Sequence, residues 1–382
     1  MAKVLLVDTN FSSGPIHQEL VLMGHEVHVV GNNPGDCLAK VSPSYWQLDY
    51  ADVDALKALI DREKFAFLVP GCTDRSYLSC VEAGQRRFPG LDRPNACEAI
   101  FNKRSFRRLA EKLELPAPER LPTDRLPIRW PVIVKPVDAF SGKGITVLRE
   151  NNVHAFEQAV AAARAVSPSG EYLIEAFIEG QLYSHSAFIC GGHVVQDFLV
   201  QEDSTINPFV VDTSRVVDAP TGMQARVRAC TESMAAELGL ADGLLHTQLI
   251  SQGKDIYLIE TTRRCPGDLY SQLIELSTGY PYARSYVLPF LGQSVGDAAG
   301  EIRHKHIMRH TVTLNASQSF AYLSFKSAVH IERWTPLSLV GDQLKPSPQG
   351  RVGVLFCRAT NEQELECLYQ TTLRRDLYEV CA

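Results

Sequence analysis

Residues 243–268, GLLHTQLISQGKDIYLIETTRRCPGD, combine the spacing of a β-hairpin with side chains that could bind a cation and an anion. Two runs of alternating apolar residues, 244–250 and 256–260, flank the polar connection SQGKD, in which Gly253 supplies backbone freedom. An odd-length loop pairs residues whose numbers sum to an even value. We therefore expect Gln248, Glu260 and Thr262 to point to one face of the hairpin.

That face would present an amide, a carboxylate and a hydroxyl, and Arg263 and Arg264 follow directly. Oxygen ligands beside a planar, five-donor cation are what Mg²⁺ and a transferring phosphoryl group require. A surface hairpin with an isolated glutamate is the alternative for this stretch taken alone.

A second candidate element lies in residues 130–150, WPVIVKPVDAFSGKGITVLRE. Strands at 132–135 and 145–148 enclose the loop DAFSGKG, whose glycines would let backbone N–H groups approach anionic oxygens. Lys135 stands in an otherwise apolar strand, where an unpaired ammonium would be unfavourable. Its partner is either a phosphate group or a carboxylate of the protein in an internal salt bridge.

Length and composition predict a globular chain of two or three domains. The chain has 382 residues, of which 45% are hydrophobic and 21% charged, with a net charge of −6 and no basic block typical of a nucleic-acid binder. Its ten cysteines are scattered without CxxC pairs, which favours reduced thiols in a cytoplasmic protein. No apolar run is long enough for a signal peptide or a membrane span.

Alternating strand and helix patterns in the first 94 residues predict a parallel sheet covered by helices on both faces. The first turn, TNFSSG, lacks the GxGxxG dinucleotide motif. Ligands of such sheets bind beyond the carboxyl ends of the strands, which makes Thr73 and Asp74 candidate substrate contacts. Ordinary turn residues are the alternative.

The pattern along the chain predicts three domains: an α/β domain at 1–94, a domain of two α+β subdomains at 95–295, and a small α+β domain at 296–382. Within the second, the loop 204–215 contains Asp212 and Arg215, which could grip a zwitterionic substrate. A solvent-exposed loop is the alternative there.

Six stretches in order resemble the ATP-grasp superfamily of carboxylate–amine ligases, close to carbamoyl phosphate synthetase, biotin carboxylase and L-amino acid ligase. They are NKRSFR, VIVKP, SGKG, YLIEAFIEG, HTQ and IETTRRCPGD, over residues 95–290. The resemblance implies an N-terminal pre-ATP-grasp domain at 1–94 and an ATP-grasp domain at 95–295, with ATP and Mg²⁺ as cofactors.

The resemblance also assigns roles to residues. Lys103 and Lys135 would contact the nucleotide phosphates, Gln248, Glu260 and Thr262 would hold Mg²⁺, and Arg264 would contact the transferred phosphoryl group. The loop folding over the phosphates would comprise Ser141, Gly142, Lys143 and Gly144, and the segment along the adenine Glu175, Ala176, Phe177 and Ile178. Three residues depart from the pattern: Gln248 replaces a common Glu, Thr262 an Asn, and Leu182 an acidic ribose contact.

The expected function is an ATP-dependent ligase that activates a carboxylate as an acyl phosphate and joins it to an amine. Lys135, Glu260 and Arg264 would be its catalytic residues, and Thr73, Asp74, Asp212, Arg215, Arg263 and Arg264 would contact the substrates. The alternatives are a carboxylating or phosphorylating ATP-grasp enzyme and a nucleotide-binding protein without catalysis. The expected partners are small-molecule acids and amines, with no nucleic acid or membrane. The sequence leaves the oligomeric state open, and a homodimer is one option because related enzymes often dimerise.

Overall fold

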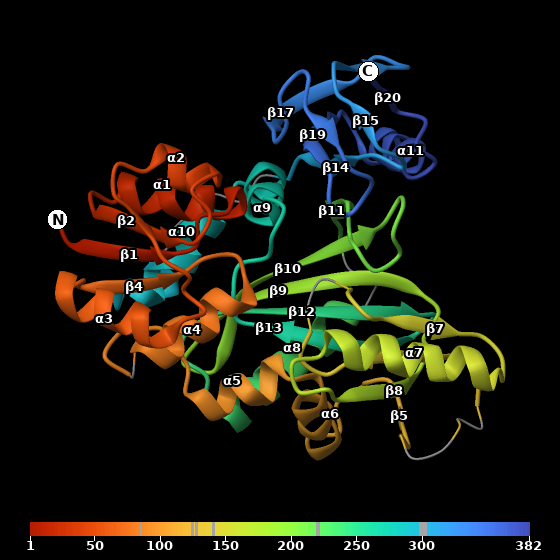
Figure 1. Cartoon of the computed structure of the whole chain (residues 1–382), viewed down its shortest axis with the longest axis horizontal. Coiled ribbons are helices and arrows are strands. Elements are labelled where there is room, and N and C mark those ends of the chain that lie inside the picture. Colours follow the sequence, from red (N-terminus) through yellow and green to blue (C-terminus); the bar gives the residue numbers. More distant parts are fainter. Residues whose placement is uncertain (85, 124–125, 127–128, 140–141, 219–221, 298–303) are drawn as a thin grey trace.

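The computed structural model of the chain contains a parallel sheet, two larger antiparallel sheets and two small two-stranded sheets (Figure 1). It describes all residues except 85, 124–125, 127–128, 140–141, 219–221 and 298–303. The predicted combination of an N-terminal parallel sheet with α+β parts is confirmed. Among the described helices, none is both long and apolar enough to span a bilayer.

The N-terminal sheet is parallel in the order β3-β2-β1-β4. Its strands are β1 (Lys3–Val7), β2 (Glu26–Gly31), β3 (Tyr45–Gln47) and β4 (Phe67–Pro70). Its helices are η1 (Phe11–Ser13), α1 (Gly14–Leu22), α2 (Cys37–Val41), α3 (Val53–Glu63) and α4 (Asp74–Gly84). Side chains of β1 alternate between two cores, since Val4 and Leu6 pack with Ile16 of α1, whereas Leu5 and Val7 pack with Leu56 of α3. Helices therefore cover both faces.

A four-stranded antiparallel sheet in the order β5-β8-β6-β7 follows two helices. The helices are α5 (Pro94–Phe101) and α6 (Lys103–Lys112), and the strands are β5 (Arg120–Leu121), β6 (Val132–Pro136), β7 (Thr146–Leu148) and β8 (Tyr172–Ala176). Helix α7 (Val153–Val166) covers one face of this sheet by packing Ala159 and Ala163 against Val132, Val134 and Ile174. The opposite face of the sheet is not covered by α7.

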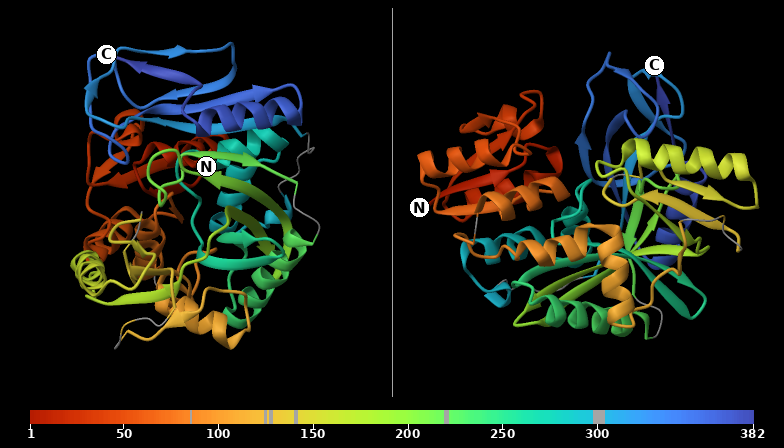
Figure 2. Two further views of the ribbon diagram at one scale, coloured as in Figure 1. Left: turned by 90° about the vertical axis from the view of Figure 1, so that its right-hand side faces the viewer. Right: turned by 60° about the horizontal axis from the view of Figure 1, so that its bottom comes forward.

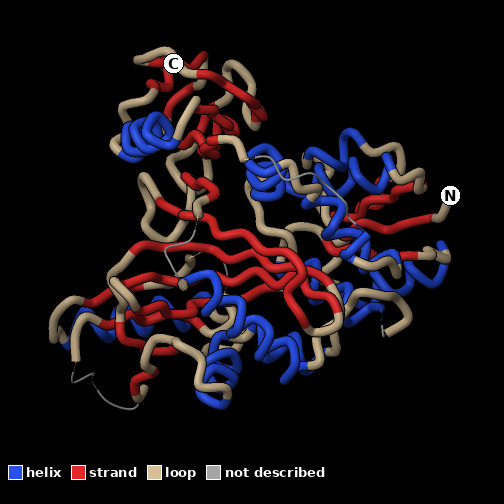
Figure 3. Tube along the Cα trace, turned by 180° about the vertical axis from the view of Figure 1, so that it is seen from behind, coloured by secondary structure: helices blue, strands red, loops and turns tan. Residues whose placement is uncertain are grey.

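An eight-stranded sheet in the order β13-β12-β9-β10-β11-β14-β19-β17 runs through the centre of the molecule (Figure 3). Its strands are β9 (Gln181–Cys190), β10 (His193–Asp203), β11 (Thr213–Val216), β12 (Gly243–Gln252), β13 (Asp255–Thr262), β14 (His306–Thr313), β17 (His330–Pro336) and β19 (Arg351–Ala359). The sheet continues across residue 296, where we expected a domain to begin. The division into 1–94, 95–295 and 296–382 stays a prediction.

Helices cover both faces of this sheet near β9 (Figure 2). On one face, Arg228 of α8 (Met223–Leu238) binds Asp197 of β10. On the other, Ser184 and Ser186 contact the hydroxyls of Tyr270 and Tyr282. These tyrosines begin α9 (Tyr270–Thr278) and α10 (Tyr282–Val287). The remaining elements are η2 (Leu288–Leu291), η3 (Val295–Asp297), β15 (Gln318–Ser319), β16 (Tyr322–Phe325), β18 (Gln343–Leu344), α11 (Glu362–Leu373) and β20 (Tyr378–Cys381).

The β12–β13 hairpin reaches its register by a different route from the predicted one. Pairing continues to Gln252 and Asp255, so the five-residue loop is wrong and the turn consists of Gly253 and Lys254. A two-residue turn alone would place Ile259 opposite Gln248. A β-bulge at Ile259 adds one residue, and Glu260 stands opposite Gln248 instead. The shared face was predicted correctly because the bulge compensates for the shorter turn.

A buried ion pair connects the N-terminal part of the chain to the end of this hairpin. Arg263 Nε donates to Asp92 Oδ2 at 2.6 Å, and the two side chains are 2% and 0% exposed. Arg263 also donates to the carbonyl oxygens of Ala241 and Leu244, and Tyr77 donates to Asp92. Its donors are therefore used within the protein, and the predicted substrate role of Arg263 is not supported.

We expect Asp92→Ala to destabilise the protein by about 3–5 kcal/mol, because it leaves the Arg263 guanidinium buried without its carboxylate. Glu119→Ala is the control, since Glu119 pairs with Arg129 on the exposed surface and should change stability by less than about 1 kcal/mol. Urea unfolding followed by tryptophan fluorescence measures both. Equal stabilities of the two variants would contradict this role for the pair.

Candidate functional site

Gln248 and Glu260 form a directly opposed pair on adjacent strands, with Lys103 close by. Glu260 is half exposed, and its Oε2 lies 4.0 Å from Lys103 Nζ, which also donates to the carbonyl oxygen of Ala139 at 2.8 Å. Lys103 is the first residue of α6, whose N-terminus is capped by the Asn102 side chain. The structure thus brings three predicted site residues together from a hairpin and a helix start.

Lys135 forms an internal salt bridge with a carboxylate of the protein, which was one of the two partners predicted for it beside a phosphate group. Its Nζ lies 2.5 Å from Glu175 Oε2, and both side chains are buried. Glu175 also accepts from Arg107 Nε at 2.7 Å. Burial lowers the pKa of Lys135 to about 8, with Glu175 opposing this effect. Burial alone would raise the pKa of Glu175, but Lys135 and Arg107 hold that pKa below its usual value.

This buried cluster has one more positive charge than negative. Two cations, Lys135 and Arg107, share the single carboxylate of Glu175, and Arg107 Nη1 is buried without a hydrogen-bond partner. Unbalanced positive charge in a low-dielectric environment attracts an anion more strongly than it would in water. The cluster therefore favours an anionic ligand such as a phosphate chain.

Arg107 was missed at the sequence level, where the basic residues of its helix were read mostly as a solvated face. It is 2% exposed, and its Nη2 donates to the carbonyl oxygen of Ile259, the residue of the hairpin bulge, at 2.9 Å. Its spacing of four residues from Lys103 places both on one side of α6, which was the available signal. Arg107 thereby joins Glu175 to the strand that carries Glu260.

The predicted phosphate-covering loop is described in part. Ser141 lies outside the described residues, while Gly142 and Gly144 have φ angles of +69° and +70°. A Cβ atom on Gly144 would lie 2.3 Å from Val166 Cγ2, so this position needs glycine for both conformation and space. Lys143 is exposed between them.

The predicted adenine segment, Glu175 to Ile178, uses part of its backbone within the protein. The Ala176 N–H donates to the carbonyl oxygen of Glu119 at 2.9 Å, and the Phe177 N–H donates to that of Pro131 at 3.1 Å. These two N–H groups form hydrogen bonds to protein carbonyl oxygens, and the Glu175 side chain pairs with Lys135 and Arg107. Ile178 is partly exposed at the end of the segment.

Thr262 and Arg264 both bind Asp74, which begins α4 of the N-terminal part. Thr262 Oγ1 donates to Asp74 Oδ1 at 2.8 Å, and Arg264 Nε donates to the same oxygen at 3.0 Å. Burial opposes the charge of Arg264, but Asp74 outweighs it and raises the pKa, with a smaller contribution from Glu260. Thr262 thus joins the Asp74–Arg264 group instead of the Gln248–Glu260 pair.

Three other predicted substrate residues serve the protein's own structure. Thr73 Oγ1 accepts from the Ser76 N–H at 3.0 Å, in the turn that begins α4. Asp212 is buried and accepts from the hydroxyl of Thr205 at 2.6 Å. Arg215 is buried and binds Gln201 and Glu366 of α11. The structure therefore gives no support for the predicted zwitterion grip of Asp212 and Arg215, which stays a prediction.

Glu202, at the end of β10, is a second residue that sequence reasoning missed. Its carboxylate accepts from Gln248 Nε2 at 2.8 Å and from Ser184 Oγ at 2.9 Å, and burial raises its pKa. Nothing in its local sequence distinguishes it from other charged residues at strand ends. Pairing of β10 with β9, and of β9 with β12, brings Glu202 to Gln248.

The arrangement suits a polyphosphate and a divalent cation bound together. Among the described residues, no group of three or more His, Cys, Asp or Glu side chains could enclose a metal ion by itself. Glu260 and Gln248 offer two oxygen-bearing side chains at a partly open position, and Mg²⁺ typically takes one or two carboxylates together with phosphate oxygens. The donor set therefore fits Mg²⁺ carried by a nucleotide.

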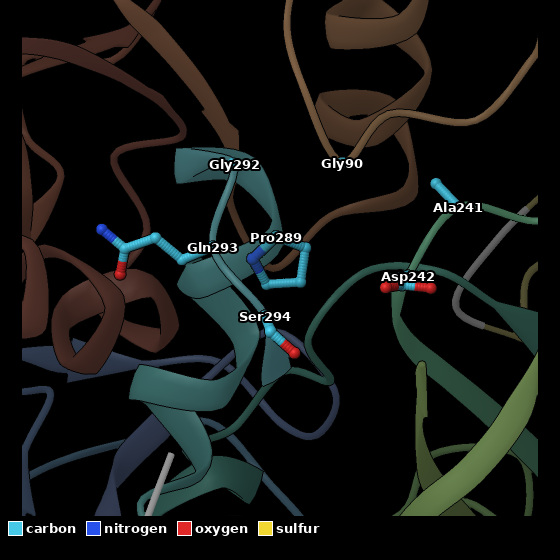
Figure 4. A pocket seen from close by; sticks show the side chains of 7 residues that line it. All are labelled: Gly90, Ala241, Asp242, Pro289, Gly292, Gln293 and Ser294. Atoms are coloured by element: carbon cyan, nitrogen blue, oxygen red, sulfur yellow. The ribbon is translucent and has the colours of Figure 1, made fainter. Parts of the chain in front are cut away.

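A shallow pocket of about 360 Å³ lies elsewhere, between the loops at Gly90 and Gly292 (Figure 4). Asp242 is the charged residue in its lining, and its carboxylate accepts from the Gly191 N–H. The lining contains no cation that could bind a phosphate. The candidate functional site is therefore the group around Gln248, Glu260 and Lys135, and not this pocket.

Comparison with known proteins identifies the fold and its central domain. Residues 128–272 match the ATP-grasp domain family. The order of the motifs predicted an ATP-grasp domain, and this match confirms one over residues 128–272.

Curated relatives are similar over part of the chain. It is 28% identical to formate-dependent phosphoribosylglycinamide formyltransferase of Pasteurella multocida over 188 residues, which are 46% of this chain and 47% of the relative. It is 27% identical to the protein of that name from Shewanella frigidimarina over 264 residues, 64% of each chain. The matched segments thus span about half to two thirds of these relatives.

Solved structures share the whole fold at low identity. L-amino acid ligase of Bacillus licheniformis has a TM-score of 0.79 at 19% identity, covering 100% of this chain and 98% of that one. N5-carboxyaminoimidazole synthetase of Staphylococcus aureus, complexed with ADP, has a TM-score of 0.73 at 13% identity, covering 97% of each.

The biotin carboxylase domain dimer of Hydrogenobacter thermophilus 2-oxoglutarate carboxylase has a TM-score of 0.76 at 14% identity, covering 100% of this chain and 90% of that one. It contains MgADP, ADP and bicarbonate. The ligands of these neighbours agree with the prediction of ATP and Mg²⁺ for this fold family.

We expect Arg107→Met to destabilise the protein by about 3 kcal/mol, because it removes a buried partner of Glu175 and the donor to the Ile259 carbonyl. The neighbouring exposed Arg108→Met should stay within about 0.5 kcal/mol of the parent. Thermal unfolding of both variants compares them. A parental melting temperature for Arg107→Met would show that the cluster does not stabilise the hairpin.

Proposed function

We propose that this protein is an ATP-dependent ligase that activates a carboxylate as an acyl phosphate and joins it to an amine, releasing ADP and phosphate. The observation that carries the proposal is the gathering of Glu260, Gln248 and Lys103 beside the buried, positively charged cluster of Lys135, Arg107 and Glu175. The ATP-grasp match over 128–272 contains most of these residues.

The chemistry needs activation because a carboxylate attacked by an amine would have to expel oxide. Transfer of the terminal phosphoryl group of ATP to the carboxylate creates a phosphate leaving group instead. Glu260 and Gln248 would hold Mg²⁺, which neutralises charge on the phosphate oxygens when bound. Lys135 and Lys103 would hold the phosphate chain in place, and the loop 141–144 would exclude water from the activated acid.

Arg264 and Asp74 lie where the hairpin meets the N-terminal sheet, beyond the carboxyl end of β4. Ligands of parallel sheets bind at such ends. Arg264 is one fifth exposed and Asp74 about one seventh. We assign Arg264 to the transferred phosphoryl group and the Asp74 region to the accepting substrate.

A carboxylating reaction is a second candidate, supported by the bicarbonate bound to one structural neighbour. Formate, which the names of the matched curated relatives mention, is a carboxylic acid and falls under the first candidate. A one-carbon acid would need a smaller space than an amino acid. The two candidates share the nucleotide site and differ in the acid that is activated.

The decisive experiment measures ADP release with panels of acids and amines, including formate and bicarbonate. The ligase proposal expects release that depends on one acid and one amine together, and hydroxylamine should trap the activated acid as a hydroxamate. Glu260→Gln should lower the rate roughly a hundredfold through loss of a metal ligand. Glu119→Gln on the surface is the matched control. ADP release independent of any acid would contradict the proposal.

Nucleotide binding should weaken as the pH rises above about 8. The Lys135 pKa of about 8 means that its ammonium loses its proton there, and phosphate binding favours the charged form. Protons should therefore be taken up on binding near pH 8, and the affinity should fall at higher pH. Titration calorimetry in two buffers of different ionisation enthalpy measures this uptake. Lys135→Arg keeps its charge over this pH range, so it should take up many fewer protons on binding.

A further inference from the structure

The side-chain amide of Gln248 is held in one orientation by Glu202. Gln248 Nε2 donates to Glu202 Oε2 at 2.8 Å. Glu202 is 5% exposed, and its other carboxylate oxygen accepts from Ser184 Oγ at 2.9 Å. Both oxygens of this carboxylate therefore have partners, and its position is fixed from two strands.

Glu202 accepts this hydrogen bond, so the amide turns its NH₂ group toward Glu202. The amide oxygen then faces away from Glu202, and Gln248 stands directly opposite Glu260. Only the oxygen of an amide binds a hard cation such as Mg²⁺. An amide free to flip would present N–H groups to the cation for part of the time.

The charge of the pair also matters. Gln248 is neutral, and Glu202 brings one negative charge directly behind it. Glu202 and Glu260 together give this face two carboxylates. A glutamate at 248 would bring two carboxylates into contact without a proton between them, which repels.

We propose that Glu202 is a positioning residue of the magnesium site, which holds the Gln248 oxygen toward the cation and makes an amide at 248 necessary. This inference rests on the proposed function, in which Gln248 and Glu260 hold Mg²⁺. It predicts that positions 202 and 248 require one carboxylate and one amide, and that exchanging the two is tolerated better than either single change.

The test uses four proteins: the parent, Glu202→Gln, Gln248→Glu and the double exchange. The first measurement is the melting temperature without nucleotide or metal, and the second is the Mg²⁺ concentration that half-saturates ATP binding. Glu202→Gln should raise this concentration about tenfold, as loss of a residue supporting a metal ligand does. Gln248→Glu should melt lower than the parent. The double exchange should recover the melting temperature and bring the Mg²⁺ requirement within about threefold of the parent.

Gln18→Glu is the matched control, because it makes the same change at an exposed position of α1. It should alter neither measurement. The inference is overturned if Glu202→Gln leaves the Mg²⁺ requirement within twofold, or if the effects of the single changes simply add in the double exchange. Failure of the parent to bind MgATP would instead contradict the proposed function. In that case, the melting temperatures still decide whether the two positions are coupled.

Discussion

The candidate site depends on the ion pairs that the buried carboxylate of Glu175 makes with Arg107 and Lys135. Glu175 binds Arg107 of α6 and Lys135 of β6 from its own place on β8, and Arg107 continues to the carbonyl oxygen of Ile259 on β13. One carboxylate thus connects a helix, the four-stranded sheet and the hairpin that carries Glu260. A buried charge with two partners tolerates little displacement, because separation leaves an uncompensated ion.

The hairpin bulge is the second constraint, and it determines which residue enters the site. Without the bulge, regular pairing from the two-residue turn would place Ile259 opposite Gln248. The Ile259 carbonyl at the bulge accepts from Arg107. The Glu175 cluster and the bulge therefore support each other, and the position of Glu260 follows from both.

The sequence predicted the fold class well, because alternation, glycine placement and motif order are local properties. The turn length was predicted wrongly, because a bulge cannot be recognised from alternation. Gln248 and Glu260 were nevertheless predicted correctly to lie on one face. Arg107 was read as exposed because its partner Glu175 lies 68 residues away. Glu202 was missed for the same reason, as only the pairing of three strands brings it to Gln248.

Two neighbouring arginines of the IETTRRCPGD motif have different partners, which their spacing alone does not reveal. Arg263 and Arg264 follow each other in the chain, but one is buried against Asp92 and the other binds Asp74 beside the site. Successive side chains of an extended segment point in opposite directions. The choice between them requires knowledge of what lies on each side.

The unbroken eight-stranded sheet limits how this protein can open for its ligands. Strands β13 and β19 belong to one hydrogen-bonded ladder, so the parts of the chain before and after residue 296 cannot swing apart without breaking backbone pairs. The four-stranded sheet with α7 is a separate layer, joined to the ladder through side chains such as Arg107. A displacement of that smaller layer as a unit would therefore break no backbone pairs of the eight-stranded ladder.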